Sequence, residues 1–285
     1  MNILVTGSNG QLGAELINKS RLIDSDDKFI TLTNSDYYKL NSIKKELDKV
    51  KPDIIINCCA YTKVDESENN FELANLLNYK FVKLLVDWSN KNSCRLIHIS
   101  TDYVFDGKSK VKYTEESKAN PLNVYGKTKL KGDIYCLNNC KNIIILRTSW
   151  LYSTNKSNFL NNILNQIKTK NEIKVVSDQF GSPTYTSDLA NIIFDIIFKN
   201  VWKSGLYNYS GEAVISWFDF ASDILRLRNS DIKIKPIKTK DINFMATRPK
   251  FSALDNSKIY NTFKISAFSY KDSLKTCLKN LENEE

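Results

Sequence analysis

The sequence predicts an α/β protein with a doubly wound parallel sheet and a smaller mixed α/β lobe. In the first half of the chain, short apolar runs alternate with stretches of helical character. A glycine-containing turn joins the first apolar run to the first helical stretch. The 285 residues suffice for one large core and an appended lobe. Continuous apolar runs are typical of parallel strands that helices cover on both faces.

Strands and helices are expected to alternate up to about residue 150. The expected strands are Ile3–Val5, Phe29–Leu32, Asp53–Cys58, Arg95–Ile99 and Asn142–Arg147. The expected helices are Gln11–Lys19, Ser42–Val50, Asn69–Lys91 and Asn123–Leu137. This alternation favours a parallel sheet with right-handed crossovers.

The rhythm changes after Trp150. Helices are expected at Phe159–Lys168, Asp188–Lys199, Trp217–Arg228 and Ser269–Leu281. Ile232–Ile237 alternates apolar and basic residues, which predicts a strand with one exposed face. We expect the sheet to be completed by about residues 172–210, and a second lobe to comprise residues 151–171 and 211–285.

Composition narrows the class of protein. The formal net charge is +9, but only six of the 41 basic residues are arginine and the lysines are spread along the chain. No nucleic-acid partner is therefore predicted, although a positive surface would attract an anionic substrate. No apolar stretch approaches the roughly 20 residues that span a membrane, and no basic segment precedes the first strand. We expect a cytoplasmic protein with reduced cysteines.

No metal site is predicted. A structural zinc site needs about four ligands, and the single histidine, His98, lies within an apolar run. Of the six cysteines, Cys58, Cys59 and Cys94 fall in or beside apolar strand runs, where a thiol packs as a small hydrophobic group.

The turn after the first strand has the pattern of a dinucleotide-binding loop. Gly7, Gly10 and Gly13 are three of only nine glycines in the chain. They would allow a tight turn, close approach of a diphosphate, and close packing of helix on strand. The helix N-terminus would then face the anion. Residues 1–150 are accordingly expected to form an NAD(P)-binding, Rossmann-like domain.

The residue after the second strand usually selects the cofactor. An acidic side chain there binds the free ribose hydroxyls of NAD. Here Thr33 and Asn34 follow Leu32, Asp36 comes slightly later, and Lys39 is the nearest basic residue. The choice between NADPH and NADH stays open on this pattern.

A Tyr-x-x-x-Lys pair indicates ketone reduction. The pattern occurs four times, beginning at Tyr79, Tyr125, Tyr152 and Tyr260. Only the second pair, Tyr125 with Lys129, lies on the helix after a strand that ends in hydroxyl residues. The carboxyl ends of strands form the ligand crevice in such sheets, which favours this pair.

The chemistry of the pair suits a reductase. A tyrosine can give a proton to a carbonyl oxygen, and a lysine one helical turn away stabilises the resulting phenolate. The hydroxyl of Thr101 can hydrogen-bond the carbonyl oxygen as charge develops there.

The chain resembles the extended short-chain dehydrogenase/reductases, and within them the dTDP-4-dehydrorhamnose reductase family. The resemblance covers nearly the whole length. It rests on the segments Thr6–Gly13, Pro52–Asp65, Ser100–Gly107, Pro121–Lys129, Arg147–Trp150, Asp178–Thr184, Arg248–Pro249 and Leu254–Asp255.

The resemblance implies specific residue roles. Thr101, Tyr125 and Lys129 would be catalytic, and Asp102 and Trp150 would contact the sugar nucleotide. The cofactor would be lined by Gly7, Gly10, Gln11, Leu12, Gly13, Thr33, Ala60, Tyr61 and Thr62. Thr33 stands where the family usually has an acid. Some relatives form metal-bridged dimers through glutamates; Glu15 matches one of these, which leaves a homodimer open without predicting the metal.

The implied activity is NAD(P)H-dependent reduction of the C4 keto group of dTDP-4-dehydro-L-rhamnose to dTDP-L-rhamnose, a step of nucleotide-sugar and polysaccharide biosynthesis. Two alternatives stay open: reduction of another 4-keto-6-deoxy sugar nucleotide, and a non-catalytic regulatory subunit of the same fold. The intact Thr101, Tyr125 and Lys129 argue against the regulatory subunit.

Overall fold

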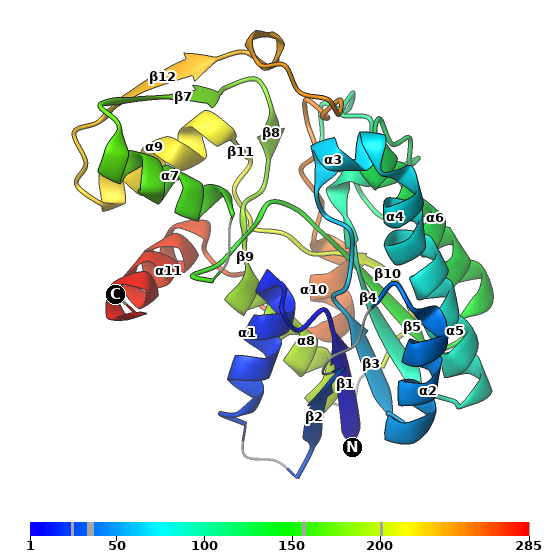
Figure 1. Ribbon diagram of the computed structural model, residues 1–285. Helices are drawn as coiled ribbons and strands as arrows, with labels where there is room; N and C mark the ends of the chain where they lie inside the picture. The colour runs from blue at the N-terminus through cyan, green and yellow to red at the C-terminus, as the bar shows by residue number, and fades with distance from the viewer. Residues whose placement is uncertain (24–25, 33–36, 156–157, 200–201, 285) are drawn as a thin grey trace.

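The chain folds around one parallel six-stranded sheet (Figure 1). The structure is a computed structural model that describes every residue except 24–25, 33–36, 156–157, 200–201 and 285. The strands run in the order β10-β5-β4-β3-β1-β2. Their bounds are β1 Asn2–Thr6, β2 Lys28–Thr31, β3 Ile54–Asn57, β4 Arg95–Thr101, β5 Ile143–Thr148 and β10 Gly205–Asn208. The predicted doubly wound fold class is confirmed.

Helices cover both faces of the sheet, as the continuous apolar strands require. One face packs against α1 (Gln11–Ser20), α8 (Thr186–Phe198) and α10 (Ser257–Phe263). The other face packs against α2 (Leu40–Val50), α5 (Phe81–Lys91) and α6 (Val124–Asn139). In the part of the chain that is described, no helix is long and apolar enough to span a membrane.

The single helix expected over Asn69–Lys91 is wrong in detail. The structure has α3 (Val64–Asn69), α4 (Phe71–Asn75), a π-helical turn η1 (Leu76–Lys80) and then α5. The break has a physical reason. Asn78, on the π-turn, hydrogen-bonds the backbone of Tyr61 and the hydroxyl of Thr128. π-turns inside helices often mark functional sites.

The second lobe has its own aromatic core. Its helices are α7 (Phe159–Thr169), α9 (Trp217–Leu227) and α11 (Tyr270–Glu284). Strands β7 (Glu172–Val176) and β12 (Lys233–Ile237) pair in parallel beside them. The lysines of β12 are exposed, which confirms the expected strand with one exposed face.

Short strands connect the lobe to the main sheet. They are β6 (Leu151–Tyr152) with β9 (Thr184–Tyr185), and β8 (Phe180–Gly181) with β11 (Ile215–Ser216). The described residues also form two 3₁₀ turns, η2 (Asp102–Val104) and η3 (Thr239–Asp241). The chain therefore passes between the two parts several times, and residues from both line the cleft described next.

Candidate active site

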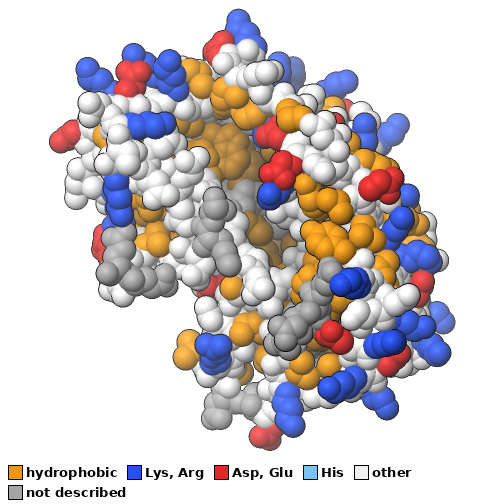
Figure 2. All heavy atoms as spheres, viewed as in Figure 1, with side chains coloured by type: hydrophobic (Ala, Val, Ile, Leu, Met, Phe, Trp, Pro, Cys, Tyr) orange, Lys and Arg blue, Asp and Glu red, His pale blue; other side chains and the backbone are white. Residues whose placement is uncertain are grey.

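A large cleft lies between the carboxyl ends of the sheet strands and the second lobe. Its volume is about 760 Å³. Figure 2 shows the surface hollowed between the lobe and the α3–α6 side, with hydrophobic side chains inside the hollow. The predicted residues that line it are Gly7, Gly10, Gln11, Leu12, Gly13, Ala60, Thr62, Thr101, Asp102, Tyr125, Lys129 and Trp150.

The three glycines of the loop have different tasks. Gly7 has a φ of +64°, a left-handed conformation that favours glycine. A Cβ on Gly13 would lie 2.3 Å from the carbonyl oxygen of Gly7, so the packing of helix on strand leaves no room for a side chain at this position. A Cβ on Gly10 would meet only that same oxygen, at 3.2 Å. Gly10 therefore keeps the surface open where the N-terminus of α1 faces the cleft.

Tyr37 was missed by the sequence analysis. Its hydroxyl accepts a hydrogen bond from the backbone N–H of Gly7 at 2.9 Å, and its ring packs edge-on against Phe81. It lines the cleft beside the loop from Gly7 to Gly13, which is called the phosphate loop below. Thr33 and Asp36 lie outside the described residues, so the position expected to select the cofactor is not placed by the structure.

The segment after β3 divides between the cleft and the surface. Ala60 and Thr62 line the cleft, together with Cys58 and Cys59, which sequence reasoning treated only as packing groups. Tyr61 is not among the lining residues: its hydroxyl donates to the Glu66 carboxylate at 3.4 Å.

Tyr125 and Lys129 lie one turn apart on α6, so that both reach the cleft. The helix begins after Asn123, whose side chain accepts the backbone N–H of Gly126 at 2.8 Å. A Cβ on Gly126 would lie 2.1 Å from the carbonyl oxygen of Tyr103. The first turn of α6 is thus pressed against η2, which follows Thr101.

The other Tyr-x-x-x-Lys pairs are not brought to the cleft. Lys83 is half exposed and pairs with Asp87 at 3.0 Å. Tyr152 is buried in the core of the second lobe. Tyr260 hydrogen-bonds Glu212, away from the lining residues. Among the four Tyr-x-x-x-Lys pairs, Tyr125 with Lys129 is the one whose residues are both among the described residues that line the cleft.

Burial sets the protonation of the site. It raises the pKa of Tyr125 to about 12, opposed by a hydrogen bond with Thr101. Burial lowers the pKa of Lys129, opposed mainly by the charge of Asp133. It also raises the pKa of Asp102 to about 7. Tyr125 therefore holds its proton at neutral pH, and the charge of Asp133 favours the ammonium form of Lys129.

Trp150 faces the cleft from the end of β5 in a left-handed conformation, with φ of +46°. Its indole stacks on Trp217, the first residue of α9, with ring centroids 3.5 Å apart. Trp217 in turn contacts Phe159 at 4.5 Å. A Cβ on Gly181 would lie 2.5 Å from the Trp150 ring, so this glycine makes room for the stack. Sequence reasoning missed Trp217 because it lies on the other lobe.

The fold and the cleft define a dinucleotide-binding α/β protein of the reductase type, with a tyrosine–lysine pair at the carboxyl edge of the sheet. The chain belongs to the family described as "RmlD substrate binding domain", whose model matches residues 1–283. The family resemblance predicted from the motifs is confirmed.

Named relatives agree with the family. The dTDP-4-dehydrorhamnose reductase of Aggregatibacter actinomycetemcomitans is 35% identical, covering 96% of this chain and 97% of its own length. The crystal structure of a dTDP-4-dehydrorhamnose reductase from Clostridium acetobutylicum is 36% identical with a TM-score of 0.93, covering 99% of this chain and 100% of that one. The Bacillus anthracis reductase, solved with NADP, is 31% identical with a TM-score of 0.92, covering 98% and 99%.

Proposed function

We propose that this chain is an NAD(P)H-dependent reductase of the C4 keto group of dTDP-4-dehydro-L-rhamnose, giving dTDP-L-rhamnose. The observation that carries the proposal is the meeting of Thr101, Tyr125 and Lys129 in one cleft with the open N-terminus of α1. The names of the relatives point to the same substrate.

The cleft fits a nicotinamide dinucleotide. Gly10, Gln11 and Leu12 present the helix N-terminus to a diphosphate, and the bare surface at Gly10 is the space that its close approach needs. Ala60 and Thr62 line the path towards the catalytic pair. When bound, NADPH or NADH supplies the hydride.

The chain itself supplies the proton and the charge stabilisation. Tyr125, protonated at neutral pH, donates its proton to the carbonyl oxygen. Lys129, as an ammonium, stabilises the phenolate that remains. The hydroxyl of Thr101 donates to the same carbonyl oxygen as negative charge develops on it.

The sugar nucleotide would lie between the strand ends and the second lobe, for which we propose residues 151–171 and 211–285. Asp102 lines the cleft, and we propose that its carboxylate accepts a hydrogen bond from a sugar hydroxyl. Trp150 would cover the sugar ring. Such an enzyme would act in the cytoplasm, as a monomer or a homodimer.

The test follows NAD(P)H absorbance with a panel of 4-keto-6-deoxy sugar nucleotides. The proposal expects the fastest turnover with dTDP-4-dehydro-L-rhamnose. Faster turnover of another member would assign the enzyme to that sugar instead. Tight NADPH binding without turnover of any member would indicate a regulatory subunit.

A further inference from the structure

A row of buried polar side chains crosses the sheet next to the catalytic lysine. Thr6, Asn57 and His98 are register partners on β1, β3 and β4, so they point to the same face. The hydroxyl of Thr6 donates to Asn57 Oδ1 at 2.7 Å. Two residues after His98 on β4, Ser100 points to the same face of the sheet. Its register partner on β5 is Arg147.

This row fixes the orientation of the Asn57 amide. Besides Thr6, the backbone N–H of Cys59 donates to Asn57 Oδ1, at 3.2 Å. A backbone N–H cannot accept, so the atom facing it is the oxygen. The Asn57 nitrogen therefore faces His98 Nδ1, at 3.0 Å, and donates to it.

The amide in turn fixes the tautomer of His98. Because Nδ1 accepts a hydrogen bond, it carries no proton. Burial holds the pKa of His98 well below its usual value, and Lys129 lowers it further, so the ring is neutral. Its single proton is therefore on Nε2.

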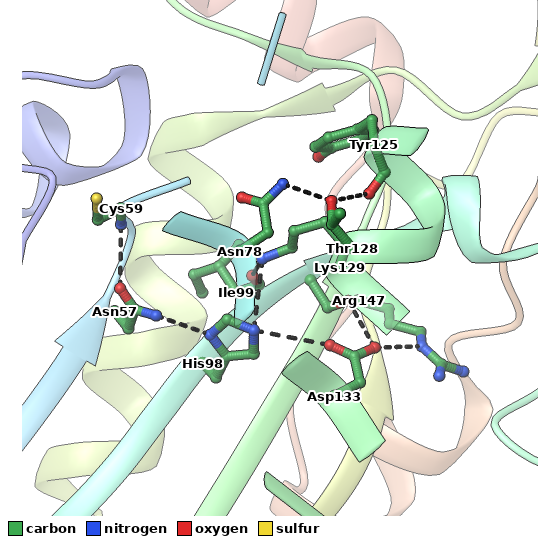
Figure 3. Close-up of polar contacts among 11 residues, drawn as sticks. Asn57, Cys59, Asn78, His98, Ile99, Tyr125, Thr128, Lys129, Asp133 and Arg147 are labelled. Atoms are coloured by element: carbon green, nitrogen blue, oxygen red, sulfur yellow. Dashed lines mark hydrogen bonds and ion pairs between the residues drawn. The ribbon is translucent and has the colours of Figure 1, made fainter. Parts of the chain in front are cut away.

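The Nε2–H lies between two charged groups (Figure 3). Lys129 Nζ is 3.4 Å away and Asp133 Oδ1 is 3.6 Å away. A protonated Nε2 cannot accept from an ammonium, so Lys129 donates instead to the carbonyl oxygen of Ile99, at 2.6 Å. The Nε2–H faces Asp133 Oδ1, which has no closer donor among the described residues.

Asp133 is held firmly on its other side. Its Oδ2 accepts from the Ser100 hydroxyl at 2.7 Å and from Arg147 Nε at 3.3 Å. All three side chains are buried. Arg147 lies on the far side of Asp133 from Lys129 (Figure 3), so the carboxylate stands between the two cations. Burial raises the pKa of Asp133, and both cations oppose that rise.

Asp133 is the negative charge that Lys129 meets. The next largest charge effects on its pKa come from thiols, on α6 and in the segment after β3: Cys136, Cys59 and Cys58. Burial raises the pKa of each of these thiols, so they are neutral at physiological pH. His98 is neutral as well.

We infer that Asp133 and His98 are positioning residues for Lys129. Asp133 supplies the buried charge that keeps the lysine an ammonium, and His98, as the Nε2–H tautomer, separates ammonium from carboxylate. Without this spacer the two groups would pair directly, and Lys129 would turn away from the cleft. The inference rests on the proposed function for the role of Lys129, but the tautomer does not.

The tautomer can be measured directly because the chain has one histidine. We would label the tag-free, ligand-free protein with ¹⁵N-histidine and record the imidazole nitrogen shifts from about pH 6 to 9. We expect a neutral ring with the proton on Nε2 throughout. A proton on Nδ1, or a ring that titrates near the ordinary histidine pKa of about 6.5, would overturn the inference.

The role of Asp133 is tested with two variants that break the same ion pair. Asp133→Asn removes the charge that favours the ammonium, so the alkaline limb of the kcat–pH profile should move to lower pH by about 1–3 units. Arg147→Gln removes the opposing cation and should move the limb to higher pH. Asp133→Glu should return the limb towards that of the wild type.

If the two variants acted only by disturbing the structure, the alkaline limb would move in the same direction in Asp133→Asn and Arg147→Gln. That result would overturn the inference. If Asp133→Asn does not fold, the histidine spectrum of the wild type still tests whether His98 is the Nε2–H tautomer that the spacer role requires. Failure of the proposed function looks different: no sugar nucleotide is reduced, while the tautomer and NADPH binding are as stated.

Discussion

The two walls of the cleft are built in different ways. On the sheet wall, the polar groups behind Lys129 occupy register positions on neighbouring strands, and nearly every one is buried and hydrogen-bonded. On the opposite wall, called the lobe wall here, Trp150 from the end of β5 stacks on Trp217 of the second lobe, and Trp217 contacts Phe159 behind it.

The difference indicates that proton transfer and sugar binding depend on different kinds of contact. A register shift of one residue would turn His98 and Asn57 to the opposite face, so the parallel ladder fixes the groups that lie behind the proposed site of proton transfer. The stacked rings come from different segments and do not depend on strand register, so we expect them to adjust more readily to a ligand. The sheet wall should therefore govern turnover, and the lobe wall should govern which sugar binds and how tightly.

The largest expected effect is on the sheet wall, for Tyr125→Phe. The variant removes the proposed proton donor and keeps the ring, so turnover should fall by about 10²- to 10⁴-fold. NADPH affinity, measured by calorimetry, should change little. Turnover near that of the wild type would mean that another group supplies the proton.

Asp102→Asn tests the cost of a buried carboxylate at the cleft. Burial raises the folded pKa of Asp102 to about 7, above the unfolded value of about 3.9. Folding therefore favours the protonated acid, and the wild type loses stability as pH rises from about 4 to 7. The variant lacks this loss, so its free energy of unfolding relative to the wild type should rise by up to about 4 kcal/mol between pH 4 and 8.

Urea unfolding at the two pH values measures the difference. Asp106→Asn is the control of opposite sign: hydrogen bonds led by the backbone N–H of Lys108 lower the pKa of Asp106. That carboxylate stabilises the fold above its unfolded pKa of about 3.9, so its loss should cost stability at both pH 4 and pH 8, and the cost should disappear only below the lowered folded pKa. If the difference in free energy of unfolding between Asp102→Asn and the wild type were the same at both pH values, the raised pKa of Asp102 would be refuted.

Gly10→Val separates ligand binding from folding within the phosphate loop. The added side chain would enter the cleft, where it meets little protein, and obstruct the diphosphate. We expect NADPH affinity to fall roughly 10- to 100-fold, the scale of one charge-assisted hydrogen bond, with little change in melting temperature. Gly13→Ala, whose Cβ would clash with the Gly7 carbonyl, should lower the melting temperature instead. Unchanged NADPH affinity in Gly10→Val would make the loop a structural turn only.

The strands, the glycine turn and the Tyr125–Lys129 pair could be predicted from the sequence because their signals are local. Continuous apolar runs indicated the parallel strands, and the glycine spacing and the Tyr125–Lys129 pair each fall within one turn or helix. The cofactor-selecting residue stays undecided, since Thr33 lies outside the described residues.

Other features depend on contacts between distant segments. Asn78 breaks the expected helix to bond Thr128, 50 residues further along the chain. The role of His98 appears only once β3 and α6 bring Asn57 and Asp133 to either side of it. Trp217 reaches the cleft only when the second lobe packs against Trp150. No pattern within a single segment reports such pairings.

The smallest expected effect is on the lobe wall, for Trp217→Leu. The variant removes the stacking partner of Trp150 without touching the catalytic pair. Stacking of aromatic rings contributes about 0.5–1.5 kcal/mol beyond area burial, so KM for the sugar nucleotide should rise roughly 2- to 10-fold while kcat is nearly unchanged. Phe159→Leu, one ring further from the cleft, should lower the melting temperature and change KM less. Trp217→Phe should restore part of the affinity. A loss confined to kcat would mean that the lobe wall takes part in the chemistry, and the division between the two walls would then be wrong.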